Sequence, residues 1–87
     1  MKNSGMWKKI PLHRALLEIV ISRSEGISET KLVETLKKEY EIEPTHPELY
    51  HILMKLELQG LIHVESVGRE FVIRPSSQAL HYFSTRA

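Results

Sequence analysis

The residues best suited to chemistry lie between positions 45 and 60. They share hydrogen-bond donors carried at helical spacing, on His46, Tyr50, His51 and Lys55. Imidazole, phenol and ammonium groups can bind the phosphate oxygens and base edges of nucleic acids. Glu48 and Glu57 lie in the same segment, so these residues are equally consistent with an ordinary solvated helix face.

Two further groups of cations could bind phosphate. Lys8, Lys9 and Arg14 cluster near the N-terminus, where several cations together would release counterions from a nucleic acid. A solubilising terminus explains this cluster equally well. Arg69 lies in a short turn between two apolar runs, from which it could contact a nucleic-acid backbone.

The residue types argue against catalysis and against a metal site. The chain has no cysteine and no aspartate, and it lacks both a glycine-rich phosphate loop and a nucleophile elbow. Its five histidines include no pair four residues apart of the kind that binds zinc. We therefore expect no enzyme activity, no metal and no cofactor.

Composition indicates one globular domain over residues 1–87, with residues 1–6 frayed. Of the 87 residues, 41% are hydrophobic and 26% are charged, and the net charge of the chain is +1. Five of the first 24 residues are Lys or Arg, whereas residues 25–48 contain seven glutamates. No apolar run could span a bilayer, so we expect a cytoplasmic protein without membrane contact. Eleven glutamates, few side-chain amides and eight isoleucines favour a thermophilic source.

The elements that would position these side chains begin with two helices. From Pro11, apolar residues recur at helical spacing, which predicts a first helix over 11–23. Ile27 stands alone between polar residues and predicts a very short strand. Ser28 is a suitable N-cap for a second helix over 29–40.

The third helix carries the clearest local signal in the chain. The run Thr45-His46-Pro47-Glu48 predicts a capping box with a proline in the first turn. It opens a helix over 46–59 that ends before Gly60, a residue suited to a left-handed stop. We expect the inward side of this helix to consist of Leu49, Ile52, Leu53 and Leu56.

After the third helix the pattern changes to strands. Residues 61–65 and 70–74 are β-branched or aromatic runs around a glycine-containing turn, which predicts a hairpin that pairs with the strand at Ile27. Pro75 should end the second strand. Ser76 could then cap a short C-terminal helix over 78–83, within residues 76–87.

Met54 and Leu58 allow two interpretations. Both lie at or beside the outward edge of the third helix, where apolar side chains would indicate contact with a protein, including a second copy of the chain. Alternatively, a wider apolar stripe buries them against the hairpin. We favour burial.

The order helix, short strand, helix, helix, hairpin is that of a winged helix-turn-helix. This is an α+β fold, mostly α, in which a β-hairpin wing covers the open edge of a three-helix bundle. A two-stranded hairpin is marginal alone, and three short helices leave part of their apolar surface uncovered. Packing the hairpin on the helices stabilises the hairpin and covers the apolar surface of the helices.

The segment from Leu49 to Ile62 resembles the recognition helix and wing start of PadR-like transcriptional regulators. A Leu-Tyr pair opens the helix, a Leu-Glu pair ends it, and Gly-Leu-Ile leads into the wing. This wing departs from the family pattern because Glu65 and Glu70 flank Arg69, and the long C-terminal helices of the family are absent or reduced to residues 76–84. Small archaeal winged-helix proteins are similar at the same level.

The resemblance implies a small transcriptional regulator that binds double-stranded DNA. The third helix would enter the major groove, and the wing would contact the backbone or minor groove. A symmetric homodimer would use the terminal segments, with Trp7, Leu80, Tyr82 and Phe83 at its interface. The alternative is a winged-helix module that binds a protein in a replication, repair or transcription assembly, which the acidic second segment and near-neutral charge favour.

Overall fold

The first helix supplies one wall of the core. The computed structural model describes the backbone of residues 10–84 and the side chains of residues 10–81. Helix α1 (Leu12–Ser22) follows Pro11 and lies within one residue of the predicted bounds at each end. Its spacing of apolar residues brings four of them to a single side, where they are buried: Ala15, Leu16, Ile19 and Val20.

Helix α2 (Glu29–Tyr40) has the predicted bounds. The Oγ atom of Ser28 accepts a hydrogen bond from the N–H of Lys31 at 3.2 Å, which confirms Ser28 as the N-cap. The helix ends at Glu41, whose φ of 56° is left-handed and allows the N–H of Ile42 to bond to the carbonyl of Leu36. The helix buries Leu32, Thr35 and Leu36, and its charged residues face outward.

Helix α3 (His46–Leu58) begins with the predicted capping box. The N–H of Glu48 donates to Oγ1 of Thr45 at 3.2 Å, and the N–H of Thr45 donates to Oε1 of Glu48 at 2.9 Å. The helix ends before Gly60, which has a φ of 77°, and the N–H of Leu61 bonds to the carbonyl of Leu56. Both ends therefore satisfy backbone groups that would otherwise lack partners.

Three antiparallel strands form one sheet in the order β1-β3-β2. Strands β2 (Ile62–Val67) and β3 (Glu70–Pro75) form the hairpin, and β1 (Ile27–Ser28) pairs with β3 as predicted, with Ile27 opposite Ile73. The approach to β1 requires Gly26, which has a φ of 109° and where a Cβ would lie 3.1 Å from a methyl carbon of Val72.

The predicted bounds of β2 were wrong at both ends. Leu61 lies outside β2 because its N–H caps α3 instead of joining the sheet. At its other end β2 continues to Val67, and a two-residue loop with Gly68 at its first position (φ 64°) closes the hairpin. β3 ends at Pro75 as predicted, and Pro75 is itself the last residue of the strand, where it pairs with Ile62.

Helix α4 (Ser77–Ser84) extends the predicted C-terminal helix by one residue at each end. Ser76 is buried and links this helix to the end of α3. Its Oγ atom donates to the carbonyl of Gly60 at 2.7 Å and accepts from the N–H of Ala79 at 3.0 Å, so it caps α4 as expected. Buried Ala79 lies on this helix, which contacts α1.

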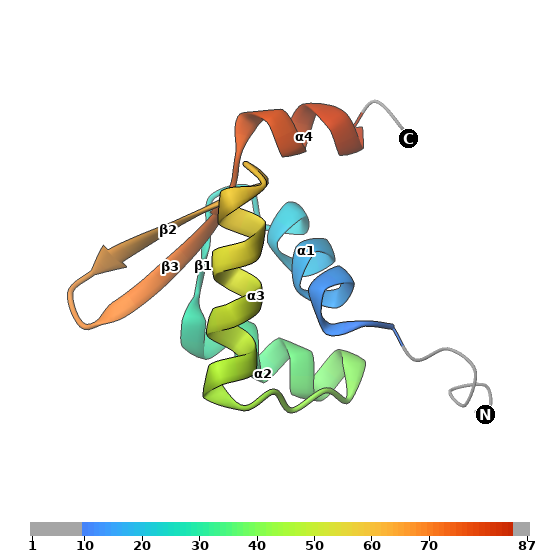
Figure 1. Ribbon diagram of the computed structural model, residues 1–87, viewed down its shortest axis with the longest axis vertical. Helices are drawn as coiled ribbons and strands as arrows, with labels where there is room; N and C mark the ends of the chain where they lie inside the picture. The colour runs from blue at the N-terminus through green and yellow to red at the C-terminus, as the bar shows by residue number, and fades with distance from the viewer. Residues whose placement is uncertain (1–9, 85–87) are drawn as a thin grey trace.

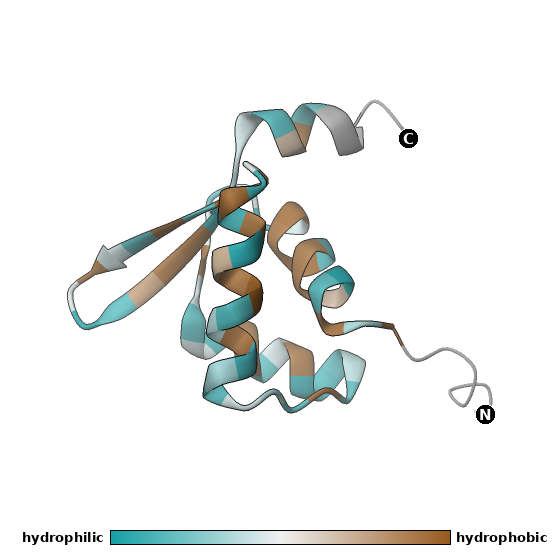
Figure 2. Ribbon diagram, in the orientation of Figure 1, coloured by the Kyte–Doolittle hydropathy of each residue, from teal (hydrophilic) through white to brown (hydrophobic). Residues whose placement is uncertain are grey.

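The described residues form a small α+β fold, mostly helical, with four helices and one three-stranded sheet. Figure 1 shows α3 through the middle of the view, α1 on one side and the hairpin projecting on the other. Hydrophobic and hydrophilic residues alternate around α1 and α3, as in amphipathic helices (Figure 2). Among the described helices, none has the length and apolar character needed to cross a bilayer.

Candidate nucleic-acid interface

The two sides of α3 differ in what they contact. Leu49, Leu53 and Leu56 are buried in the core, as predicted, while Ile52 is half-buried against it. Because successive residues of a helix are about 100° apart, His51 and Lys55 lie on the side away from these leucines, and both are exposed. Two of the donors singled out in the sequence, His51 and Lys55, therefore lie outside the core.

Tyr50 is held in place by its neighbours. Its hydroxyl donates to Oε2 of Glu29 on α2 at 2.8 Å. Its ring makes edge contacts with His46 and with Phe71 of β3, at centroid distances of 5.8 and 6.3 Å. The hydrogen bond to Glu29, and then desolvation and the charge of that carboxylate, raise the pKa of Tyr50 above its usual value. Tyr50 thus joins α2, α3 and the hairpin.

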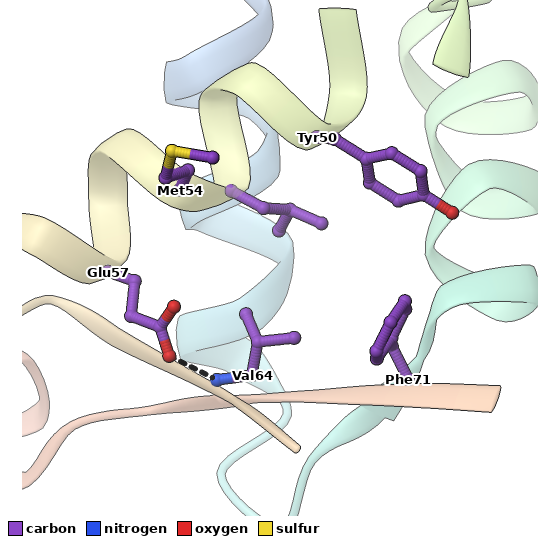
Figure 3. Close-up of a pocket in the computed structure, with 6 residues that line it drawn as sticks. Tyr50, Met54, Glu57, Val64 and Phe71 are labelled. Carbon is purple, nitrogen blue, oxygen red and sulfur yellow. Dashed lines mark hydrogen bonds between the residues drawn. The ribbon is translucent and has the colours of Figure 1, made fainter. Parts of the chain in front are cut away.

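An open groove separates α3 from the hairpin (Figure 3). It encloses about 340 Å³ and is lined mainly by apolar and aromatic side chains, namely Tyr50, Leu53, Met54, Glu57, Val64 and Phe71. Oε2 of Glu57 accepts the N–H of Val64 at 3.1 Å, which fixes the start of the hairpin to α3. Beyond that bond the two elements diverge, and the groove lies between them.

The prediction that Met54 and Leu58 are buried against the hairpin was wrong. The two residues are 60% and 82% exposed. Met54 borders the groove, between the contact of Glu57 with Val64 and that of Tyr50 with Phe71, and the hairpin does not cover it. Leu58 is one turn further along the helix and rotated away from the groove. The alternative that places these residues on an exposed edge is the one the structure supports.

The remaining candidate residues are scattered. Arg69 is exposed in the loop at the hairpin tip. Arg14 lies on α1, where its Nε pairs with Glu18 at 3.4 Å, so it is not part of the α3 face. Within the described part of the chain, Lys55 and Arg69 take part in no ion pair. Leu80 is half-buried on α4.

Five predicted residues have no described side chain. Trp7, Lys8 and Lys9 lie outside the described residues, and so do the side chains of Tyr82 and Phe83. The expectations of a basic N-terminal arm and of a dimer contact through the terminal segments therefore remain predictions.

Sequence reasoning missed the contribution of the hairpin to this face. Phe71 and Val64 line the groove, and Glu29 orients Tyr50. Strand alternation could have identified the first two, because Phe71 is two residues from buried Ile73 and Val64 pairs with Ile73. No sequence signal links Glu29 to Tyr50, since that contact depends on how α2 packs against α3.

Nothing in the described residues gathers three potential metal ligands at one place. Comparison of the chain with protein-family models, with curated proteins and with solved structures finds no match. Any functional conclusion therefore depends on the geometry of α3 and the hairpin alone.

Proposed function

We propose that this chain is a winged helix-turn-helix protein that binds double-stranded DNA, with α3 in the major groove and the hairpin against the backbone. The order of elements supports the fold, because β1 precedes α2 and pairs with β3, which attaches the hairpin to the helical part of the molecule. Helix-turn-helix proteins bind DNA with the second helix of the pair, here α3.

One observation carries the proposal. The leucines of α3 face the core, and this leaves His51 and Lys55 exposed on the opposite, outward side of the helix. Lys55 can donate to a phosphate or to guanine, and His51 to a phosphate or base edge. Arg69 at the hairpin tip is a second exposed cation without an ion pair among the described residues, and it suits a contact with the DNA backbone.

We further propose that the protein is a small transcriptional regulator of the PadR-like kind. The segment from Leu49 to Ile62 supports this assignment, since it contains most of α3, the turn that follows and the first residue of β2. A symmetric dimer would allow two half-sites to be bound together and would raise a modest single-domain affinity.

The test is a fluorescence-anisotropy titration of duplex DNA with the full chain at several salt concentrations. Saturable binding at about 50 mM salt is expected, with log affinity falling linearly against log salt because phosphate contacts release counterions.

Lys55→Gln should weaken binding and make the salt slope shallower by about one. Lys38→Gln is the matched control, because Lys38 is an exposed lysine on α2 that forms no ion pair among the described residues. The absence of saturation, or of any salt slope, would refute the proposal.

The alternative, a module that binds a protein partner, is favoured by one specific observation. All large hydrophobic residues that are exposed in the described part of the chain lie on α3 or the hairpin: Tyr50, Met54, Leu58, Val67 and Phe71. Exposed apolar patches mark interaction sites. Affinity capture from source lysate separates the two functions, because recovery of nucleic acid without a stoichiometric protein would count against the module.

A further inference from the structure

The outward side of α3 has the pattern of a helix that packs on another helix. Pro47, His51, Met54 and Leu58 follow one another at intervals of four, three and four residues. All four are exposed. The same intervals place the contact residues of paired helices in a continuous line, so this line can pack against a second helix.

The apolar members of this line are not required by the fold. Leu58 is 82% exposed, and the exposed fraction rises from Tyr50 through Met54 to Leu58 as the residues turn away from the core. No large hydrophobic residue described on α1 or α2 is exposed to this degree. A surface that places its exposed apolar side chains on one face is suited to a partner.

Charges on one side of this line indicate which partner. Glu48 and Lys55 are seven residues apart, so they lie on the same side of the line, two turns from each other. When two copies of α3 pack antiparallel about a twofold axis, the same sides meet in opposite directions. Glu48 of each copy then lies opposite Lys55 of the other, and two ion pairs form.

The monomer leaves both groups available for these pairs. Lys55 has no ion pair among the described residues, and the capping box uses only Oε1 of Glu48. Glu57, on the other side of the line, already accepts the N–H of Val64. The acidic partner that suits Lys55 is therefore Glu48 of a second copy.

From this pattern and its self-complementary charge we infer that two copies of the chain associate through the outward faces of α3, packed antiparallel. The helix has 13 residues and is about 20 Å long, so the contact is smaller than the roughly 800 Å² per partner of stable complexes. The association is therefore weak and concentration-dependent. It covers His51 and Lys55, so this dimer and DNA compete for one face.

Sedimentation velocity of the full chain without DNA tests the inference, over about 5 to about 500 µM, where small interfaces associate. The weight-average mass should rise from 10.1 kDa toward twice that value. Leu58→Ser should remain monomeric throughout. Val67→Ser is the control, because Val67 is also exposed but lies on the opposite face of the hairpin from Val64 and Phe71.

Two charge variants test the antiparallel arrangement. Glu48→Gln keeps the capping box, since glutamine also serves at that position, and should weaken dimerisation about threefold to tenfold through the loss of both ion pairs. Lys55→Glu should weaken it further through repulsion from Glu48, and adding Glu48→Gln to that variant should restore part of the loss. Circular dichroism verifies that each variant is folded.

The results separate this inference from DNA binding. Glu48→Gln removes a negative charge from the proposed DNA-contacting face, so it should weaken the dimer without weakening DNA binding. A mass of 10.1 kDa at every concentration would overturn the inference and leave the DNA titration to be judged separately. Equal self-association of the Leu58→Ser and Val67→Ser variants, or an unchanged dimer in Glu48→Gln, would also overturn it.

Discussion

Helices α2 and α3 are built alike on the inside and differently on the outside. Each is an amphipathic helix with a side-chain N-cap, and each buries leucines in the same core. The outer side of α2 is mostly charged, and two of its three lysines pair with glutamates: Lys31 with Glu34 at 3.4 Å and Lys37 with Glu43 at 3.3 Å. The outer side of α3 instead exposes Met54, Leu58 and an unpaired Lys55.

The outer side of α2 is therefore a hydrated, charged surface, whereas the outer side of α3 is a surface that can bind a partner. Exposed ion pairs contribute little to stability, so the outer side of α2 is explained by hydration alone. Hydration does not explain Leu58, which the fold leaves 82% exposed. The contrast with a helix of similar length in the same molecule therefore supports the proposal that partners bind to α3.

The largest effects should come from the inner sides, where the two helices are alike. Leu32→Ala on α2 and Leu53→Ala on α3 each remove a buried side chain from the shared core. Each should lower the free energy of unfolding by about 2 to 5 kcal/mol, through lost burial and the cavity that remains. Urea denaturation measures this. Leu58→Ala is the control, and a loss above about 1 kcal/mol there would contradict the exposed position assigned to it.

Removal of the N-caps should give the next largest decreases in the free energy of unfolding, and the decrease should be larger for α3 than for α2. Ser28→Ala removes one side-chain bond at the start of α2, whereas Thr45→Ala combined with Glu48→Ala removes both bonds of the capping box at the start of α3. We expect a loss of about 1 kcal/mol for Ser28→Ala and up to about 2 kcal/mol for the Thr45→Ala, Glu48→Ala double variant. Equal losses in thermal or urea unfolding would show that the second bond of the capping box contributes nothing.

Two tyrosines form hydrogen bonds between α2 and its neighbouring helices. Their pKa shifts predict that the stability of the protein depends on pH in the alkaline range. Tyr40 donates to Oε1 of Glu18 on α1 at 2.9 Å, and Tyr50 donates to Glu29. Burial, followed by the bond to Glu18, raises the pKa of Tyr40 above 10.0, and the bond to Glu29 is the main cause for Tyr50.

The sign of the effect follows from these directions. A group whose pKa is raised by folding contributes its full stability below its unfolded pKa, here 10.0. That contribution is lost as the pH rises through the higher folded pKa. Unfolding free energies measured from about pH 8 upward should therefore fall more steeply for the wild type than for Tyr40→Phe or Tyr50→Phe. Parallel curves would show that neither bond contributes to stability.

The elements were predictable because their signals are local. The capping box at Thr45, the N-cap at Ser28 and the left-handed stop at Gly60 each depend on a few neighbouring residues, and the structure contains all three. Strand ends were less predictable, because they depend on competition for backbone groups. The N–H of Leu61 could have joined the sheet, but the end of α3 uses it.

The candidate site was only partly predictable for the same reason. Helical periodicity was sufficient to place His51 and Lys55 outside and the leucines inside. It could not determine how far the hairpin diverges from α3, and this distance decides whether Met54 is buried or exposed. The contact of Tyr50 with Glu29 likewise depends on packing between residues 21 positions apart.

The smallest change in stability should come from the outer charges, and it sharpens the contrast between the two helices. Lys31→Gln breaks the exposed pair with Glu34, and Lys55→Gln breaks no ion pair that the described residues make, so each should shift the free energy of unfolding by less than about 0.5 kcal/mol. Their effects on partners should differ. Lys55→Gln should weaken both DNA binding and self-association, because Lys55 lies on the outward side of α3, whereas Lys31→Gln should change neither. Anisotropy and sedimentation measurements on the same two variants provide the comparison. Equal effects of the two substitutions on both partners would mean that the outer side of α3 has no role that α2 lacks.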